Sequence, residues 1–192
     1  MNGGAADPGA RLGTARMVLR RFTSNDVDLL VELDSDIEVM RFLTGRTTDR
    51  EEVRDVWMPR ILAAYRRHPG FGRWAAQSRD TGEFLGWFGL RIDSDADPSE
   101  VELGYRLRRA AWGRGLATEG GRVLVDYAFS HPQVRRIFAE TMSVNTGSRR
   151  VLEKLGLSHV RTTHRYFDNP LPGSDHGEVE YELLRADWAA PD

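Results

Sequence analysis

The order of hydrophobic and polar positions along this chain predicts alternating strands and helices. Two apolar segments, Gly72–Ser78 and Glu83–Arg91, have the composition of buried strands, and the intervening Arg79-Asp80-Thr81-Gly82 suits a hairpin turn. An earlier strand is expected near Met17–Phe22. It leads into Thr23-Ser24-Asn25-Asp26, whose capping-box pattern predicts the start of a helix.

A second helix is predicted between that helix and the hairpin. Its start resembles another capping box, Thr48-Asp49-Arg50-Glu51, and Pro59 is expected to kink it. The apolar residues at helical spacing are Val53, Trp57, Ile61 and Ala64.

The second half of the chain continues the alternation. The predicted elements are a strand at Val101–Arg108, a helix at Leu116–Phe129, a strand at Arg135–Met142, a helix from Asn145 to Leu155, and two final strands. Residues 1–14, rich in Gly and Ala, are predicted to be a flexible tail, and residues 15–190 a single domain.

The turn before the predicted helix at Leu116 carries the first chemical signal. Its sequence is Trp112-Gly113-Arg114-Gly115-Leu116-Ala117-Thr118-Glu119. Glycines separated by one residue permit positive φ and leave the amides uncovered, and a helix start adds free N–H groups and a positive dipole end. The turn therefore predicts a phosphate cradle, although a tight turn alone would use the same glycines.

Motifs further along the chain give this turn a family context. Asn145-Thr146-Gly147-Ser148 and then Glu153-Lys154-Leu155-Gly156-Leu157 follow it, and Gly104-Tyr105 precede it. This series resembles the GNAT superfamily of acyl-CoA N-acetyltransferases, and is most similar to its ribosomal-protein N-terminal acetyltransferase branch. The resemblance covers roughly Arg16 to Trp188. It implies an α/β (α+β) GNAT fold, a mixed and mostly antiparallel sheet of about seven strands with helices on both faces.

The resemblance implies an N-acetyltransferase that moves an acetyl group from acetyl-CoA directly to a primary amine in a ternary complex, without a metal. The strand before the glycine turn would pair with the pantetheine arm as an added strand would, and the turn would hold the pyrophosphate. The implied cofactor-binding residues are Tyr105, Arg106, Leu107, Arg109, Trp112, Gly113, Arg114, Gly115, Leu116, Ala117, Thr118, Asn145 and Ser148. Two structural alternatives stay open: Asn145 could serve only as a helix N-cap, and Gly104 could mark a bulge in an ordinary strand.

Two positions depart from the family pattern. Ala110 replaces the first residue of the pyrophosphate motif, so Arg109 or Arg114 would have to supply charge. Leu152 occupies the position of the usual tyrosine general acid, which leaves Ser148 as the candidate proton donor to the thiolate.

The general base has two candidates. His164 has an intrinsic pKa in the useful range and lies in the acceptor-facing region that the resemblance implies. Glu102, on the central strand, could activate an amine through water. The alternatives are an exposed strand residue for His164 and an ion pair with Arg106 for Glu102.

Composition limits the remaining possibilities. The 192 residues carry a formal net charge of −2, which gives no reason to expect nucleic-acid binding. The absence of cysteine excludes disulfides and a cysteine nucleophile. With no signal-peptide pattern and no long apolar run, we expect a cytoplasmic protein without membrane contact. The sequence leaves open whether the protein is a homodimer. Acid-rich segments at Asp93–Glu100 and Asp168–Glu180 favour a cationic acceptor.

The acceptor could be a small-molecule amine or a protein N-terminus. The alternative function is a non-catalytic CoA-binding sensor or scaffold of the same fold, which Ala110 and Leu152 suggest. A nucleotide-binding fold is disfavoured because no acidic residue caps a second strand in a repeated βαβ pattern.

Overall fold

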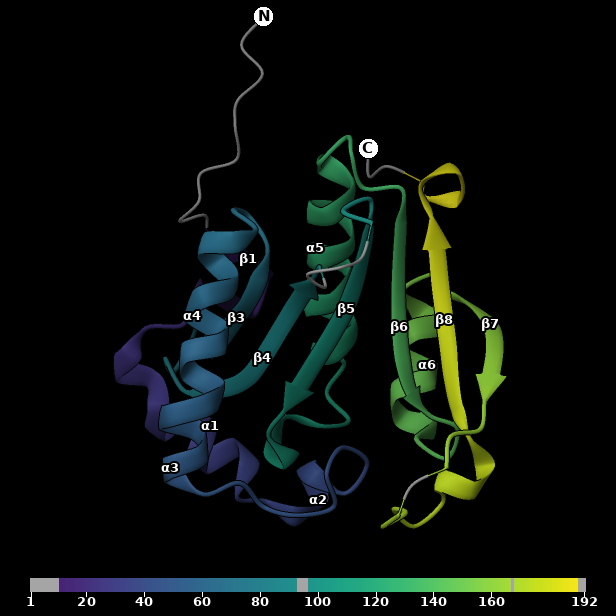
Figure 1. Cartoon of the computed structure of the whole chain (residues 1–192). Coiled ribbons are helices and arrows are strands. Elements are labelled where there is room, and N and C mark those ends of the chain that lie inside the picture. The colour runs from purple at the N-terminus through teal and green to yellow at the C-terminus, as the bar shows by residue number, and fades with distance from the viewer. Residues whose placement is uncertain (1–10, 93–96, 167, 190–192) are drawn as a thin grey trace, which may run out of the picture.

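A single sheet organises the computed structural model, which describes residues 11–92, 97–166 and 168–189 (Figure 1). Its eight strands lie in the order β1-β2-β3-β4-β5-β6-β8-β7. All neighbours are antiparallel except β5 and β6. The strands are β1 (Leu12–Gly13), β2 (Met17–Arg21), β3 (Gly72–Ser78), β4 (Phe84–Arg91), β5 (Glu100–Leu107), β6 (Arg136–Met142), β7 (Ser158–Thr163) and β8 (Glu178–Leu184).

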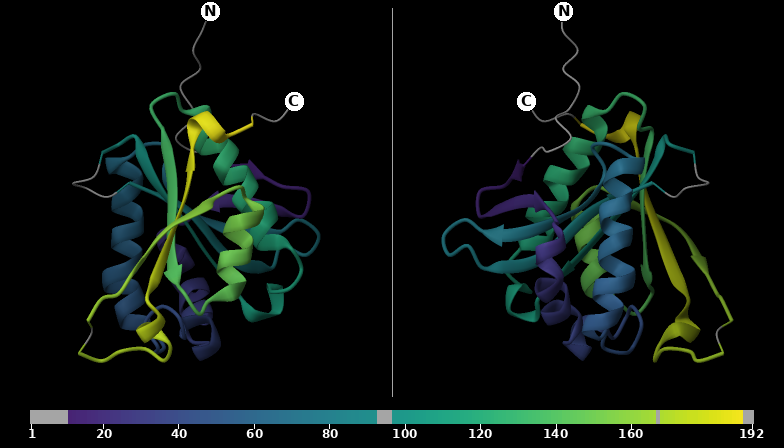
Figure 2. Two further views of the ribbon diagram at one scale, coloured as in Figure 1. Left: turned by 90° about the vertical axis from the view of Figure 1, so that its right-hand side faces the viewer. Right: turned by 60° about the vertical axis from the view of Figure 1, so that its left-hand side comes forward.

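Helices cover both faces of this sheet, as the left view of Figure 2 shows. The α-helices are α1 (Val27–Asp34), α2 (Ile37–Met40), α3 (Arg50–Glu52), α4 (Met58–Arg67), α5 (Leu116–Ser130) and α6 (Thr146–Lys154). Shorter turns are the 3₁₀ segments Ser24–Asp26, Arg109–Ala111, Ser174–His176 and Arg185–Asp187 and the π-helical segment Val53–Trp57. The expected mixed, mostly antiparallel architecture is confirmed.

Strand alternation divides the core into two layers. Trp74 and Phe88 belong to the hydrophobic cluster under α5 and α6, whereas their strand neighbours Ala75 and Trp87 belong to the cluster under α1 and α4. Strands β3 and β4 are therefore buried on both faces.

Helix α5 lies unusually close to the sheet, which explains its paired glycines. A Cβ built on Gly120 would lie 2.3 Å from the ring of Phe88, and one on Gly121 would lie 2.6 Å from Leu155. The partners in this close packing are β4 and the end of α6.

Several boundaries differ from the sequence expectations. Leu12 and Gly13 pair with β2, so the described end of the predicted tail belongs to the sheet, while residues 1–10 of that tail lie outside the described residues. The N-cap before α3 is Asp49, whose carboxylate accepts the Glu52 amide at 2.7 Å. Pro59 lies in the first turn of α4 behind the π-helical segment, whose wider turn takes the place of the expected kink.

The bulge considered for Gly104 is absent. β4 and β5 pair in an unbroken register from Gly86↔Leu107 to Arg91↔Glu102, and the irregularity falls instead between β3 and β4 at Ala76 and Gln77.

Candidate active site

The loop between β5 and α5 presents a row of free backbone amides. Gly113 (φ 70°) and Gly115 (φ 76°) both take the left-handed conformation, which residues with a Cβ rarely adopt. Among the described residues, none accepts a hydrogen bond from the amides of residues 113–118, and Gly115 is the N-cap of α5 without a side-chain cap. A Cβ on Gly113 would meet no atom within 4 Å. The turn thus combines the free donors and the open space that an anion needs.

Arginines surround this turn in different roles. Arg16 donates to the Arg114 carbonyl at 3.0 Å and pairs with Glu119 at 2.6 Å, which fixes the turn against the N-terminal part of the sheet. Arg109 lies 3.5 Å from Asp36. Arg114 is exposed and has no carboxylate partner within the described part of the chain, so its cation is available to a ligand.

Beside the turn, strands β5 and β6 separate. Their parallel pairing covers only Glu100–Glu102 against Arg136–Phe138, after which the strands diverge (Figure 1). A cavity of about 570 Å³ lies at this divergence. The site residues predicted from the sequence that line it are Glu102, Tyr105, Arg106, Leu107, Trp112, Gly113, Gly115, Leu116, Ala117, Thr118, Asn145 and Ser148. Arg109, Arg114 and His164 do not.

The backbone of β5 offers an unpaired edge in this cavity. The Arg108 amide donates to the Leu85 carbonyl at 2.9 Å, so strand alternation turns the backbone groups of Tyr105 toward β6 and those of Arg106 toward β4. The Leu107 carbonyl accepts the Trp112 indole N–H at 2.8 Å. Of the three residues predicted to pair with pantetheine, Tyr105 therefore has the most accessible backbone groups.

Tyr105 also brings a hydroxyl to Ser148. Its Oη lies 3.1 Å from Ser148 Oγ and donates to the Ser148 carbonyl oxygen at 3.3 Å. Burial raises the pKa of Tyr105 to about 12, against the opposing effect of the Ser148 hydrogen bond. Tyr105 is therefore protonated at neutral pH and can donate to a neighbouring oxygen or sulfur.

Asn145 fills the structural role considered for it and also lines the cavity. Its Oδ1 accepts the Ser148 amide at 3.2 Å at the start of α6, and its Nδ2 donates to Thr141 Oγ1 at 3.2 Å. The cap holds Ser148 in place beside Tyr105.

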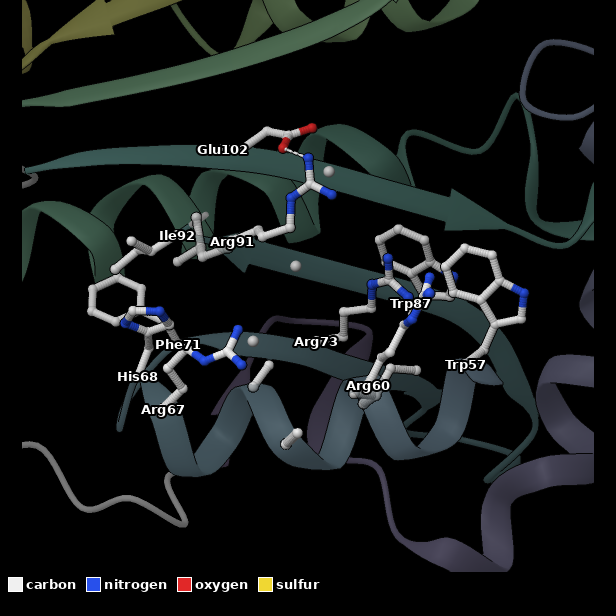
Figure 3. Close-up of a pocket in the computed structure, with 17 residues that line it drawn as sticks. Trp57, Arg60, Arg67, His68, Phe71, Arg73, Trp87, Arg91, Ile92 and Glu102 are labelled. Atoms are coloured by element: carbon white, nitrogen blue, oxygen red, sulfur yellow. Dashed lines mark hydrogen bonds and ion pairs between the residues drawn. The ribbon is translucent and has the colours of Figure 1, made fainter. Parts of the chain in front are cut away.

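A second cavity, of about 630 Å³, lies between α4 and strands β3 to β5 (Figure 3). Trp87, Glu102 and Gly104 line both cavities. The Glu102 carboxylate accepts a hydrogen bond from Arg91. The ion pair between Glu102 and Arg106, considered from the sequence, does not form. Arg106 instead pairs with Asp34 of α1 at 2.5 Å.

His164 lies apart from this junction. It is exposed, directly after the end of β7, and lines neither cavity. Its neighbour Arg165 reaches Glu140, a residue of the first cavity, at 3.5 Å. The segment therefore borders the mouth of the first cavity while the His164 side chain lies outside it.

Comparison with known proteins identifies this arrangement. The family model of the GNAT acetyltransferase domain matches residues 16–158. This chain belongs to the GNAT acetyltransferase family. It is 34% identical over 186 residues to the FsC-acetyl coenzyme A-N(2)-transacetylase of Aspergillus fumigatus, across 92% of this chain and 77% of that protein.

Solved structures agree with the fold of this family. The chain resembles RimL, a ribosomal L7/L12 alpha-N-protein acetyltransferase in complex with coenzyme A, with a TM-score of 0.78 and 16% identity over 93% of this chain and 99% of that one. It also resembles Mycobacterium smegmatis RimJ in complex with a CoA-disulfide, with a TM-score of 0.75 and 21% identity over 93% and 89% of the two chains.

As a GNAT family member, the protein is an acetyl-CoA-dependent N-acetyltransferase, which confirms the activity and the cofactor expected from the sequence. The residues present fit that cofactor: an open anion cradle at residues 113–118 adjoins an unpaired strand edge at Tyr105. Among the described residues, no cluster of three or more potential metal ligands occurs, and no helix is long and apolar enough to cross a bilayer.

Sequence reasoning missed two parts of the site. Residues of α2 and the following turn, including Val39 and Phe42, form part of the wall of the first cavity. The second cavity, with Arg73 and Trp87 on its floor, was also missed. Gly89 and Gly104 on neighbouring strands were an available signal, because glycine in a strand often marks a close approach or a ligand.

Proposed function

We propose that the protein transfers the acetyl group of acetyl-CoA directly to a primary amine in a ternary complex, with Glu102 as general base and Ser148 as general acid. The observation that carries this proposal is the sharing of Glu102 by the two cavities. The first cavity suits the pantetheine arm and the second suits the acceptor, so both substrates would meet at one carboxylate.

In the proposed reaction Glu102 accepts a proton from the ammonium through a water molecule, because an alkyl amine is mostly protonated at neutral pH. The neutral nitrogen forms a bond to the thioester carbon, and the carbon–sulfur bond then breaks. The thiolate takes the Ser148 hydroxyl proton, and Ser148 recovers a proton from Tyr105, which is replenished by solvent. The nitrogen loses its second proton to solvent through Glu102. The products are the amide, free CoA and one released proton.

Tyr105 thus compensates for the missing tyrosine in α6. Leu152, at the family's usual tyrosine position, is 1% exposed and packed in the core, whereas Tyr105 brings its hydroxyl to Ser148 from β5. This arrangement favours an enzyme over the non-catalytic sensor or scaffold that Leu152 had suggested.

The test compares Glu102→Gln with His164→Ala on the best amine from a panel, with released thiol as the readout. We expect Glu102→Gln to lower kcat/KM by roughly 10²–10⁴, the range for a general base, with unchanged CoA affinity. His164→Ala should have little effect, because this side chain lines neither cavity.

The reverse pattern would assign the base to His164. Normal activity in both variants would indicate that the enzyme selects the small deprotonated fraction of the amine. Tight CoA binding with no turnover on any amine would support the sensor. The cytoplasmic location and a homodimer stay predictions.

A further inference from the structure

Three of the four arginines that line the second cavity have no carboxylate partner among the described residues. Arg60 and Arg67 face it from α4, and Arg73 faces it from β3 (Figure 3). Within residues 11–92, 97–166 and 168–189, no Asp or Glu forms an ion pair with any of the three. Arg91, by contrast, is paired with Glu102.

Arg73 differs from two other partly buried arginines of the sheet, which have carboxylate partners. Arg20 pairs with Asp26 at 2.7 Å and Arg106 with Asp34 at 2.5 Å. The guanidinium of Arg73 instead lies 4.6 Å from the ring centroid of Trp87. A poorly solvated charge without a counterion is unfavourable, which makes this position a candidate for binding an anion.

Arg73 keeps its charge in this setting. Burial lowers the pKa of Arg73 to about 10, and the nearby charges of Arg106 and Arg91 act in the same direction. The side chain is thus cationic at neutral pH. A carboxylate beside it would offset both the free-energy cost of desolvating the guanidinium and its repulsion by Arg106 and Arg91.

The second cavity has room for a ligand beside Arg73 and Trp87. In the sheet register Arg73 pairs with Gly89, which pairs with Gly104, so these two positions add no side chain of their own, and the Trp87 ring lies against both glycines. A Cβ on Gly89 would lie 3.2 Å from Arg73 Cγ. Ala63 and Ala64 keep the facing part of α4 small, and about 630 Å³ is an ordinary volume for a small-molecule site.

We propose that the acceptor is a small molecule that carries a carboxylate as well as the amine, with the carboxylate held by Arg73 and the amine directed to Glu102. The planar guanidinium can donate two parallel hydrogen bonds to a carboxylate. Arg60 and Arg67, exposed at the edge of α4, attract the anion toward the cavity. The roof formed by α4 suits a small molecule better than a protein N-terminus. This inference rests on the proposed function.

The cavity adds a binding group for an anion to the cationic amine expected from the sequence, and that expectation stays a prediction. That expectation relied on acid-rich segments, and residues 93–96 of the first of them lie outside the described residues. The charged side chains that line the second cavity are four arginines and Glu102, the single acidic side chain among the described lining residues.

The experiment measures acetyl transfer to α- and ω-amino carboxylic acids and to their matched carboxamides, with thiol release as the readout. We expect the best carboxylate to exceed its carboxamide in kcat/KM by about 10- to 100-fold, the effect of a charge-assisted pair of hydrogen bonds. Arg73→Met should abolish that preference through a higher KM for the carboxylate. Arg66→Gln is the matched control, because Arg66 adjoins Arg67 on α4 but lines neither cavity.

A binding measurement separates this inference from the proposed function. Calorimetry with simple aliphatic and aromatic carboxylic acids that lack an amine tests the cavity without acetyl transfer. Binding that Arg73→Met removes and Arg66→Gln retains supports the inference even if no amine is acetylated. Transfer to carboxamides at rates equal to those of the acids, or carboxylate binding indifferent to Arg73, would overturn the inference and leave the transferase intact. Unchanged melting temperatures in Arg73→Met would exclude misfolding as the cause.

Discussion

The contact between α5 and β4 offers a sharp test of how this fold positions the glycine turn. Gly120→Ala would place a Cβ at 2.3, 2.6 and 2.7 Å from three ring atoms of Phe88, whose side chain is 0% exposed. Ordinary carbon contacts begin near 3.4 Å, so the ring or the helix must move by about 1 Å, since the interior is close-packed.

Two opposing effects set the magnitude. Alanine gains about 1 kcal/mol over glycine in a helix interior, whereas overpacking a core loses about 1–3 kcal/mol and occasionally more. Because the clash here involves three atoms of a buried ring, we expect the loss to win by about 1–2 kcal/mol. For a chain of this size that corresponds to a melting temperature lower by roughly 2–8 °C.

Thermal and urea denaturation measure this effect, with Gly147→Ala as control. The nearest atom to a Cβ on Gly147, in the first turn of α6, is 3.8 Å away, so this change should leave stability unchanged or raised. In a double-mutant cycle, Phe88→Leu should partly relieve Gly120→Ala. Equal stability of Gly120→Ala and Gly147→Ala, with no coupling to Phe88, would refute the packing argument.

Three further expectations concern the cofactor side of the site. Gly115→Ala should weaken CoA binding at least about 10-fold in calorimetry, because a φ of 76° is strained for alanine. If the backbone rotates to a negative φ to relieve this strain, the free amides of the turn no longer point toward the ligand. Tyr105→Phe should lower kcat more than it changes KM if Tyr105 supplies protons to Ser148, and identical kcat values would remove it from the mechanism. Stability should fall as pH rises from about 10 toward 12, because an unfolded tyrosine loses its proton near 10 while Tyr65 and Tyr105, each with a pKa raised to about 12, keep theirs. Arg73, with a pKa lowered to about 10, has the opposite effect and offsets part of the fall due to the two tyrosines. Denaturation between pH 9.5 and 11.5 should show a shallower fall in Tyr105→Phe than in the unchanged protein.

Local signals in the sequence were enough for the elements that lie close in the chain. The hairpin of β3 and β4 and the glycine turn before α5 depend on residues within one turn or one strand, so composition and spacing reveal them. The capping box at Thr23 is present for the same reason.

Contacts set by the tertiary register were not predictable in this way. Arg106 lies four residues from Glu102 in the sequence and suggested an ion pair with it, yet sheet pairing places Arg91 opposite Glu102. Tyr105 and Ser148 are 43 residues apart and meet only because α6 begins beside the diverging end of β5. The second cavity depends on glycines aligned across separate strands, and no single segment of the sequence contains it.

Strand β5 carries residues of both proton-transfer steps of the proposed reaction, deprotonation of the amine and protonation of the thiolate. Successive side chains of a strand point to opposite faces, so Glu102 and Arg106 lie on the α4 face while Leu103 and Tyr105 lie on the α5 face. The proposed base therefore faces the acceptor cavity, whereas Tyr105 meets the proposed acid, Ser148, on the opposite face of the sheet. A proton can then leave the amine on one face and reach the sulfur on the other, with the acetyl group passing between the two faces where β5 parts from β6.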